Sequence, residues 1–177
     1  MAAVDLYSFV RDIPDFPKPG IAFKDITPVL ASAQALDTAV TQLADLARPL
    51  KPDVVVGAEA RGFLLGAALA RELGAGFVLA RKPGKLPHET VRAEYLLEYG
   101  TDALELHSDA VAQGARVLVH DDLLATGGTA RALCELVEQL DGVVVGCAFL
   151  IELAFLNGRQ RLAQYDVSSL LRYDHGE

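Results

Sequence analysis

The sequence is poor in positive charge, in cysteine and in long apolar runs. Its 177 residues include 16 lysines and arginines against 24 acidic residues, which gives a formal net charge of −8. A general nucleic-acid-binding protein usually presents a basic face, so this balance argues against a nucleic-acid partner. The longest apolar run, Val143–Ile151, is strand-sized and too short to span a bilayer, so we expect no membrane partner either.

Only two cysteines are present, Cys134 and Cys147, and their separation fits neither a zinc site nor a disulfide framework. Both are expected to be buried free thiols. The N-terminal stretch carries acidic residues early and lacks an uninterrupted apolar core, unlike a secretory signal. With 51% hydrophobic and 23% charged residues, the composition is that of an ordinary soluble protein. We therefore expect one cytoplasmic domain spanning residues 1–177.

Apolar runs of strand length alternate with helical patterns along the chain. Strands are predicted at residues 54–56, 77–80, 117–119 and 143–151, with two extended arms within 95–107 and an edge strand at 167–171. Helices are predicted at residues 35–46, 63–73 and 129–140, with a short one within 1–12. This order predicts an α/β fold, with a central, mostly parallel sheet flanked by helices. In such folds ligands bind beyond the carboxyl ends of the strands.

The stretch Val117–Thr129, VLVHDDLLATGGT, carries the clearest chemical pattern. Its strand is expected to end at the acid pair Asp121 and Asp122, before a short glycine-containing loop. The loop and the helix that begins near Thr129 offer backbone amides and a positive dipole end to an anion. The carboxylates offer acceptors to hydroxyl groups beside that anion, although they could instead serve only the helix dipole. The stretch therefore predicts a site for a phosphorylated sugar.

Two further loops bring positive charge toward the same edge of the sheet. Residues 57–62 combine small residues with one cation, Arg61, which suits an anionic ligand. Residues 81–100 form a long connection that we expect to be a lid. Its first part would bring positive charge to the covered ligand through Arg81, Lys82 and Lys85. The alternative is a solvated basic loop on an acidic protein.

Residues 13–28 hold four prolines, so regular structure is not expected before Ile21. The same stretch contains several large apolar residues, which a disordered linker would not need. It is therefore expected to be an ordered, stiff loop packed on the rest of the protein. One interpretation is an N-terminal strap over the core, and the other is a hood over a flat ligand, with Phe23 as a stacking ring.

Val117–Thr129 resembles the phosphoribosyl pyrophosphate signature of the type I phosphoribosyltransferase family: an apolar strand, an acid pair and a TGGT-type phosphate loop. Further stretches resemble the members of this family that act on adenine. These stretches are residues 13–17 through 25–28, 60–63, 81–87 and 97–100. Two positions depart from the family pattern. His120 stands where an apolar residue is usual, and Ala22 stands where the hood more often has a larger one.

The resemblance implies a type I phosphoribosyltransferase-like fold with an N-terminal hood at residues 8–30 and a flexible lid at 81–100. It implies transfer of the 5-phosphoribosyl group from phosphoribosyl pyrophosphate to adenine, giving AMP and pyrophosphate. The cofactor would be Mg²⁺, bound mainly through the substrate, with Asp121 or Asp122 as further candidates to hold it. A homodimer is also implied.

The resemblance further assigns residues to four roles. The ribose 5-phosphate would contact Ala125, Thr126, Gly127, Gly128 and Thr129. The pyrophosphate would contact Glu59, Ala60, Arg61, Lys85 and Arg81, the last from either subunit. The catalytic residues would be Glu98, Asp121 and Asp122, with Tyr99 ordering the closed lid. The adenine would stack on Phe23 and meet main-chain groups as far as Lys24.

Three other functions stay open at this point. A related enzyme for a 6-oxopurine would differ mainly in how the main chain contacts the base, which leaves no side-chain signature. A regulator that senses phosphoribosyl pyrophosphate would need a basic face or a DNA-binding extension, and the net charge of −8 does not favour it. A phosphoacceptor domain using Asp121 or Asp122 would leave the TGGT loop without a purpose.

Overall fold

The structure, a computed structural model, describes residues 4–97 and 100–176. Its centre is a five-stranded sheet with the strand order β4-β3-β7-β8-β9. In that order the strands are Gly76–Ala80, Val54–Ala58, Arg116–Leu124, Val143–Leu153 and Val167–Tyr173. Every neighbouring pair in this sheet is parallel, which confirms the predicted α/β fold.

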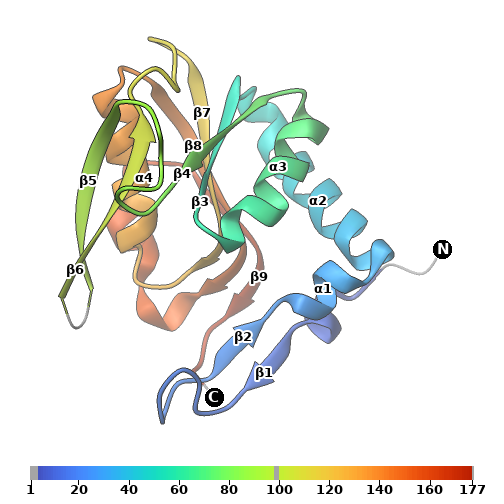
Figure 1. The fold of residues 1–177 in the computed structure, drawn as a ribbon. Helices are drawn as coiled ribbons and strands as arrows, with labels where there is room; N and C mark the ends of the chain where they lie inside the picture. The colour runs from blue at the N-terminus through green and yellow to red at the C-terminus, as the bar shows by residue number, and fades with distance from the viewer. Residues whose placement is uncertain (1–3, 98–99, 177) are drawn as a thin grey trace.

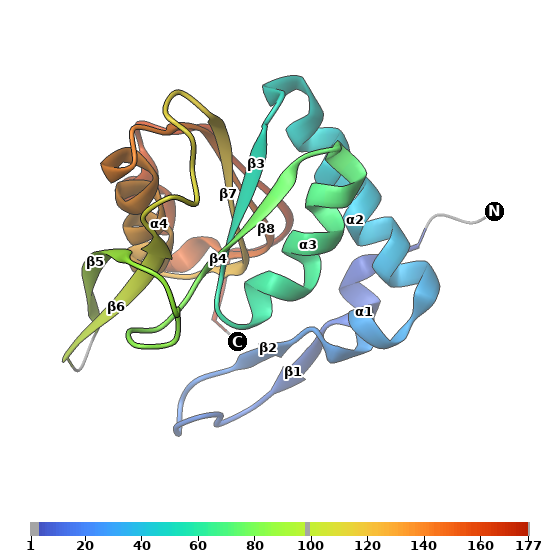
Figure 2. The same cartoon turned by 45° about the horizontal axis from the view of Figure 1, so that its top comes forward.

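Helices cover both faces of this sheet (Figures 1 and 2). On one face lie α2 (Ala33–Ala47), preceded by the short α1 (Thr27–Ala31), and α3 (Arg61–Leu73). On the other face α4 (Gly128–Gln139) packs beside a hairpin of β5 (Thr90–Leu97) and β6 (Gly100–His107). Short 3₁₀ helices are η1 (Leu6–Phe9), η2 (Arg48–Leu50), η3 (Ala154–Leu156) and η4 (Gly158–Leu162). None of the described helices is long and apolar enough to cross a membrane.

The alternation of side chains along the strands builds one apolar core on each face. Val55 and Leu118 pack in the cluster that includes α2 and α3, whereas Val119 packs in the cluster that includes α4. Cys134 and Cys147 lie in the α4-side core as free thiols, with their Sγ atoms 3.7 Å apart. The prediction of two buried free thiols is confirmed.

The central strand extends further than the sequence pattern indicated. β7 continues through the acid pair to Leu124, because β8 runs beside it in register, with Asp121 opposite Phe149 and Leu124 opposite Glu152. The expectation that this strand ends at the acids is therefore wrong. The two carboxylates stand on a hydrogen-bonded strand rather than in a loop.

Much of the expected lid is regular structure. Thr90–Leu97 is a strand that pairs with β6, with Thr90 opposite His107. Its residues Val91, Ala93 and Tyr95 alternate and pack against the α4-side core, so the first arm begins earlier than predicted. The irregular part of the lid is the basic stretch before Thr90.

The N-terminal region is a projecting hairpin (Figure 2). Within the described part of residues 1–12, the predicted helix is reduced to the 3₁₀ turn η1, and β1 (Arg11–Ile13) follows it. β1 pairs with β2 (Phe23–Asp25) in antiparallel register, with Ile13 opposite Phe23. The proline-rich connection between the two strands lacks regular structure, as predicted.

Candidate active site

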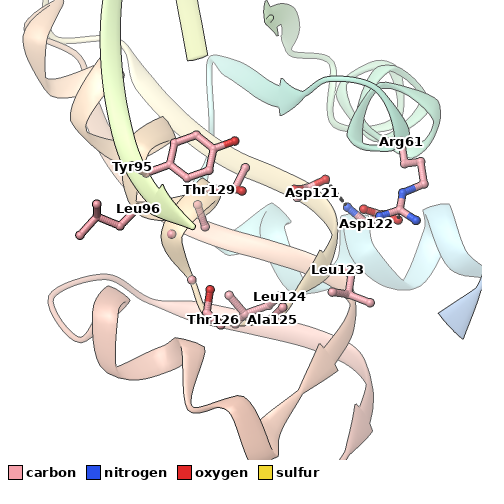
Figure 3. A pocket seen from close by; sticks show the side chains of 13 residues that line it. Arg61, Tyr95, Leu96, Asp121, Asp122, Leu123, Leu124, Ala125, Thr126 and Thr129 are labelled. Carbon is pink, nitrogen blue, oxygen red and sulfur yellow. Dashed lines mark hydrogen bonds and ion pairs between the residues drawn. The ribbon is translucent and has the colours of Figure 1, made fainter. Parts of the chain in front are cut away.

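A cavity of roughly 180 Å³ opens at the carboxyl end of β7, over the first turn of α4 (Figure 3). Arg61, Tyr95, Leu96 and residues 121–130 line it. The structure thus brings Arg61 together with the stretch that carries both the acid pair and the whole predicted phosphate loop.

The phosphate loop leaves main-chain amides free for a ligand. Gly127, the N-cap residue of α4, has a φ of +85°, and no side chain caps the helix. A Cβ on Gly127 would lie 2.6 Å from the carbonyl oxygen of Gly158, so both the backbone angle and the close packing require glycine. Uncapped amides at a helix N-terminus bind anions, and the side chains of Thr126 and Thr129 line the same cavity. This arrangement can hold a phosphate group.

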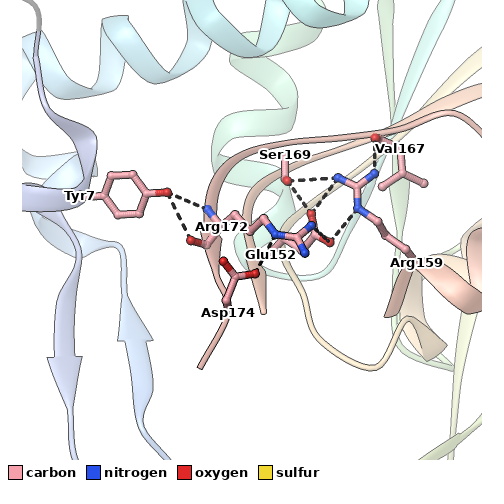
Figure 4. A network of polar contacts seen from close by, with 7 residues as sticks. All are labelled: Tyr7, Glu152, Arg159, Val167, Ser169, Arg172 and Asp174. Atoms are coloured by element: carbon pink, nitrogen blue, oxygen red, sulfur yellow. Dashed lines mark hydrogen bonds and ion pairs between the residues drawn. The ribbon is translucent and has the colours of Figure 1, made fainter. Parts of the chain in front are cut away.

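A buried acid fixes the segment that supports this loop. Glu152, at the carboxyl end of β8, accepts two hydrogen bonds from Arg159, at 2.7 and 2.8 Å, and one from Ser169 at 2.6 Å (Figure 4). Burial alone would raise the pKa of Glu152, but the contacts with Arg159 and Ser169 lower it. Because Arg159 belongs to η4, these bonds hold η4 in place beneath Gly127.

Arg161, also in η4, lies beside the phosphate loop and lines the adjoining cavity described below, although no sequence pattern pointed to it. Its Nη1 lies 3.5 Å from where a Cβ on Gly128 would be, and its own Cβ lies 3.3 Å from where one on Gly127 would be. It is exposed, and among the described residues it pairs with no acid. A helix dipole disfavours a cation at this end, and a bound anion would compensate for that cost. No local pattern connects Arg161 to the loop, because the two are far apart in the sequence.

The acid pair stands beside Arg61, with Asp122 buried and Asp121 partly exposed. Asp122 is 3% exposed, and its Oδ2 lies 3.1 Å from Nε of Arg61. Oδ1 of Asp121 accepts the main-chain N–H of Asp122 at 2.9 Å. Burial and the neighbouring Asp122 carboxylate raise the pKa of Asp121. The raised pKa of Asp121 disfavours two full negative charges side by side, so the pair offers acceptor oxygens to ligand hydroxyl groups and a single shared negative charge to a cationic centre.

Two carboxylates alone do not complete a metal site. Within residues 4–97 and 100–176, no group of three or more acidic, histidine or cysteine side chains could hold a metal ion. The pair can instead receive the hydroxyl groups of a ligand, or the water molecules of a Mg²⁺ ion that the ligand carries.

The cations assigned to pyrophosphate each contact an acid in this structure. Arg61 contacts Asp122, and both Lys85 and Arg81 contact Glu59, which follows β3. Lys85 Nζ donates to Glu59 Oε1 at 2.6 Å, and Arg81 Nε lies 3.4 Å from Oε2. Next in the chain is Ala60, the N-cap residue of α3, which has no capping side chain. Only Arg61 of these cations lines the cavity at the acid pair, whereas Glu59, Arg81 and Lys85 form a separate cluster of paired charges outside the cavity lining.

Lys82 behaves differently from its two basic neighbours. Its main-chain N–H donates to Glu59 at 2.8 Å, whereas its ammonium group pairs with Asp102 and with the hydroxyl of Tyr95. These contacts brace the β5–β6 hairpin. The expectation that the Lys82 side chain brings free positive charge to a covered ligand is therefore wrong, because Asp102 neutralises it.

A second cavity, of roughly 660 Å³, lies between the hood and the segment that follows β8. Its lining is mostly apolar: Gly20, Ile21, Ala22, Leu96, Thr126, Leu153, Phe155, Leu156, Arg161 and Gly176. Because Leu96 and Thr126 also line the first cavity, the two cavities adjoin. Phe155 and Leu156 could not be recognised from the sequence as cavity residues, because their apolar side chains resemble those of the core.

Phe23 and Lys24 lie beside this second cavity rather than in its lining. The Phe23 ring packs edge-on against Phe16, with centroids 5.1 Å apart, and the Arg61 guanidinium lies 5.0 Å from its centroid. The Lys24 side chain is buried against Asp12 and the ring of Tyr173, so its side chain serves the fold. In this structure the hood offers Ile21 and Ala22 to the cavity. Glu98 and Tyr99, the remaining predicted residues, lie outside the described residues.

Comparison with known proteins assigns the family. Residues 23–171 match the phosphoribosyl transferase domain. The chain is 59% identical to adenine phosphoribosyltransferase of Rubrobacter xylanophilus over 165 residues, which cover 93% of this chain and 89% of that protein. It is 54% identical to adenine phosphoribosyltransferase of Thermotoga maritima, over 98% of this chain and all of that protein.

Solved structures agree with this assignment. Adenine phosphoribosyltransferase from Thermoanaerobacter pseudethanolicus matches with a TM-score of 0.93 and 55% identity, over 95% of this chain and 98% of that one. The Saccharomyces cerevisiae enzyme, solved with an imino-altritol bisphosphate and adenine, matches with a TM-score of 0.87 and 40% identity, over 93% and 95%. The chain therefore belongs to the phosphoribosyl transferase family, within the group of the adenine phosphoribosyltransferases.

Proposed function

We propose that this protein transfers the 5-phosphoribosyl group of phosphoribosyl pyrophosphate to adenine, giving AMP and pyrophosphate. The observation that carries the proposal is the wall that the two cavities share. Thr126 and Leu96 line both the polar cavity at the acid pair and the apolar cavity at the hood. A sugar phosphate in the first cavity would therefore lie next to a flat base in the second.

The polar cavity would hold the ribose 5-phosphate. Main-chain amides of residues 125–129 and the hydroxyls of Thr126 and Thr129 would bind the phosphate. Asp121 and Asp122 would accept hydrogen bonds from the ribose hydroxyls. Their charge would also stabilise the positive charge that develops on the ring as the bond to pyrophosphate breaks. The base would then attack from the opposite face, with inversion at C1′.

The leaving pyrophosphate would lie against Arg61, Lys85 and Arg81, with main-chain amides from Glu59 and Ala60. When bound through the substrate, Mg²⁺ would neutralise part of its charge, and the acid pair fits the water molecules of such an ion. Closure of residues 81–100 would exclude water from the reacting carbon. In that closed state Glu98 would accept the proton that the base loses as it attacks. Tyr99 would help to order the closed lid.

The apolar cavity would hold the adenine ring. Its walls from Ile21, Phe155 and Leu156 suit a flat aromatic ligand. Main-chain groups of the hood as far as Lys24 would form hydrogen bonds with the edge of the base. Phe23 would stack on the base once the Arg61 side chain turns away from the Phe23 ring toward pyrophosphate. A buried mismatch between donors and acceptors costs about 1–3 kcal/mol, enough to separate adenine from a 6-oxopurine.

We further propose a cytoplasmic homodimer. Leu64 of α3 and Leu79 of the edge strand β4 expose 52% and 41% of their surface, and a second copy would cover these apolar side chains. Sedimentation that shows only monomers at micromolar concentration would contradict the dimer.

Turnover with each base is the direct test of the activity. Adenine, hypoxanthine and guanine are supplied in turn with phosphoribosyl pyrophosphate and Mg²⁺, and pyrophosphate release is measured. We expect adenine to be used fastest. Faster turnover of hypoxanthine would overturn the base assignment, and no turnover of any base would overturn the enzyme assignment.

A further inference from the structure

Glu59 has an arrangement that the proposed chemistry does not explain. Its side chain is only 11% exposed, yet it lies among the cations that would bind pyrophosphate. Lys85 donates to one carboxylate oxygen at 2.6 Å. The other oxygen accepts the N–H of Lys82 at 2.8 Å and lies 3.4 Å from Nε of Arg81. The Glu59 carboxylate thus occupies the cations that the proposed function assigns to pyrophosphate.

The charge on this carboxylate is permanent under ordinary conditions. Burial alone would raise the pKa of Glu59, but the contacts with Lys85, Lys82 and Arg81 lower it to about 2. When Lys85 contacts pyrophosphate, it has to share its charge with Glu59 or leave it. When pyrophosphate departs, Glu59 compensates Lys85 again, so the exit of product leaves no unpaired cation.

We propose that the Glu59 carboxylate competes with pyrophosphate for Lys85 and so weakens the hold of the site on its product. The inference rests on the proposed function, because it takes pyrophosphate as the anion released. It makes Glu59 a positioning residue that acts through Lys85. A carboxylate that only anchored the basic loop would have the opposite effect on affinity, because loosening an anchor weakens binding.

The Glu59→Gln variant separates these two roles. Glutamine keeps an oxygen acceptor for the Lys82 N–H and removes the charge. We expect the inhibition constant of magnesium pyrophosphate, measured against phosphoribosyl pyrophosphate, to fall about fivefold, the range of a partly exposed ion pair. The Michaelis constant for phosphoribosyl pyrophosphate should fall with it. An inhibition constant that stays the same or rises would overturn the proposal.

Three further variants make the result specific. Glu59→Asp keeps the charge, so its inhibition constant should stay near that of the wild type, and a fall equal to that of Glu59→Gln would refute a charge effect. Glu105→Gln is the matched control, because Glu105 accepts the N–H of Gly84 in the same loop without pairing with Lys85. In a Lys85→Met background the effect of Glu59→Gln should shrink below twofold, and a full effect there would exclude the route through Lys85.

Thermal midpoints and wild-type turnover complete the design. A Glu59→Gln protein that fails to fold would show it in its midpoint, and Glu59→Ala, which also removes the charge, would then replace it in the same measurements with the same expected fall in the inhibition constant. Wild-type protein that transfers no phosphoribosyl group to adenine would overturn the proposed function. Active wild type with an unchanged inhibition constant in Glu59→Gln would overturn this inference alone.

Discussion

His120 stands directly before the acid pair, and its burial should make the stability of this protein depend on pH. The side chain is completely buried. Its Nδ1 lies 2.9 Å from the carbonyl oxygen of Ala148 and donates to it, whereas Nε2 has no hydrogen-bond partner among the described residues. Burial lowers the pKa of His120 to about 4 from its ordinary value of 6.5. The native state therefore stays neutral at a pH where the unfolded chain binds a proton.

The sign and size of the effect follow from linkage. Between pH 6.5 and 4 the unfolded state binds more protons, so the free energy of unfolding falls as the pH falls. From pH 7 to pH 5 the two pKa values correspond to a loss of about 2 kcal/mol. For a chain of this length, such a loss lowers the thermal midpoint by about 4–8 °C.

The His120→Val variant isolates this contribution. A valine side chain cannot be protonated, so the variant should lack the part of the midpoint decrease between pH 7 and pH 5 that His120 causes. Carboxylates that titrate over the same pH range contribute to the decrease in both proteins. His175→Gln is the matched control, because His175 is exposed and should leave the pH dependence unchanged. A His120→Val midpoint that falls with pH as steeply as that of the wild type would refute the reasoning.

Three substitutions test the acid pair, the phosphate loop and Arg161 beside that loop. Arg161→Gln should raise the Michaelis constant for phosphoribosyl pyrophosphate about fivefold at low salt and less at high salt. Arg92→Gln, which changes another exposed arginine, should leave this constant unchanged. An equal rise in both variants would exclude Arg161 from the site. Gly127→Ala should weaken ribose 5-phosphate binding in calorimetry, whereas Gly114→Ala, with a φ of +76° but open space around it, should lower only the thermal midpoint. Asp122→Asn should cut turnover about a hundredfold with little change in midpoint, since its partner Arg61 is half exposed, and near-normal turnover would exclude the ribose role.

The local parts of the site could be predicted because each depends on a short stretch of chain. The valine run before the acids, the glycines of the phosphate loop and the helix after it fold according to their own pattern. The end of β7 could not be predicted in this way, because it is set by β8, whose register carries the pairing to Leu124. The strand β5 was partly missed because its alternation begins in a segment rich in charge.

The contacts between distant segments were beyond the sequence pattern. Arg161 reaches the phosphate loop only because Glu152 and Arg159 fix η4 beneath Gly127. Likewise, an isolated acid such as Glu59 gives no sign that two basic residues of another loop will converge on it. Such arrangements depend on tertiary packing, and the chain carries no periodic signal for them.

The continuation of β7 through the acid pair determines which segments lose conformational entropy when a sugar phosphate binds. β7 lies between β3 and β8, and its ladder with β8 extends past both carboxylates. The main chain that carries Asp121 and Asp122 is therefore ordered before any sugar arrives, and little conformational entropy is lost there on binding. The connection 14–22 of the hood and the basic segment 82–89 have no such ladder, so we expect the larger entropy loss there. Substitutions that stiffen those two segments, rather than the acid strand, are the ones expected to tighten binding.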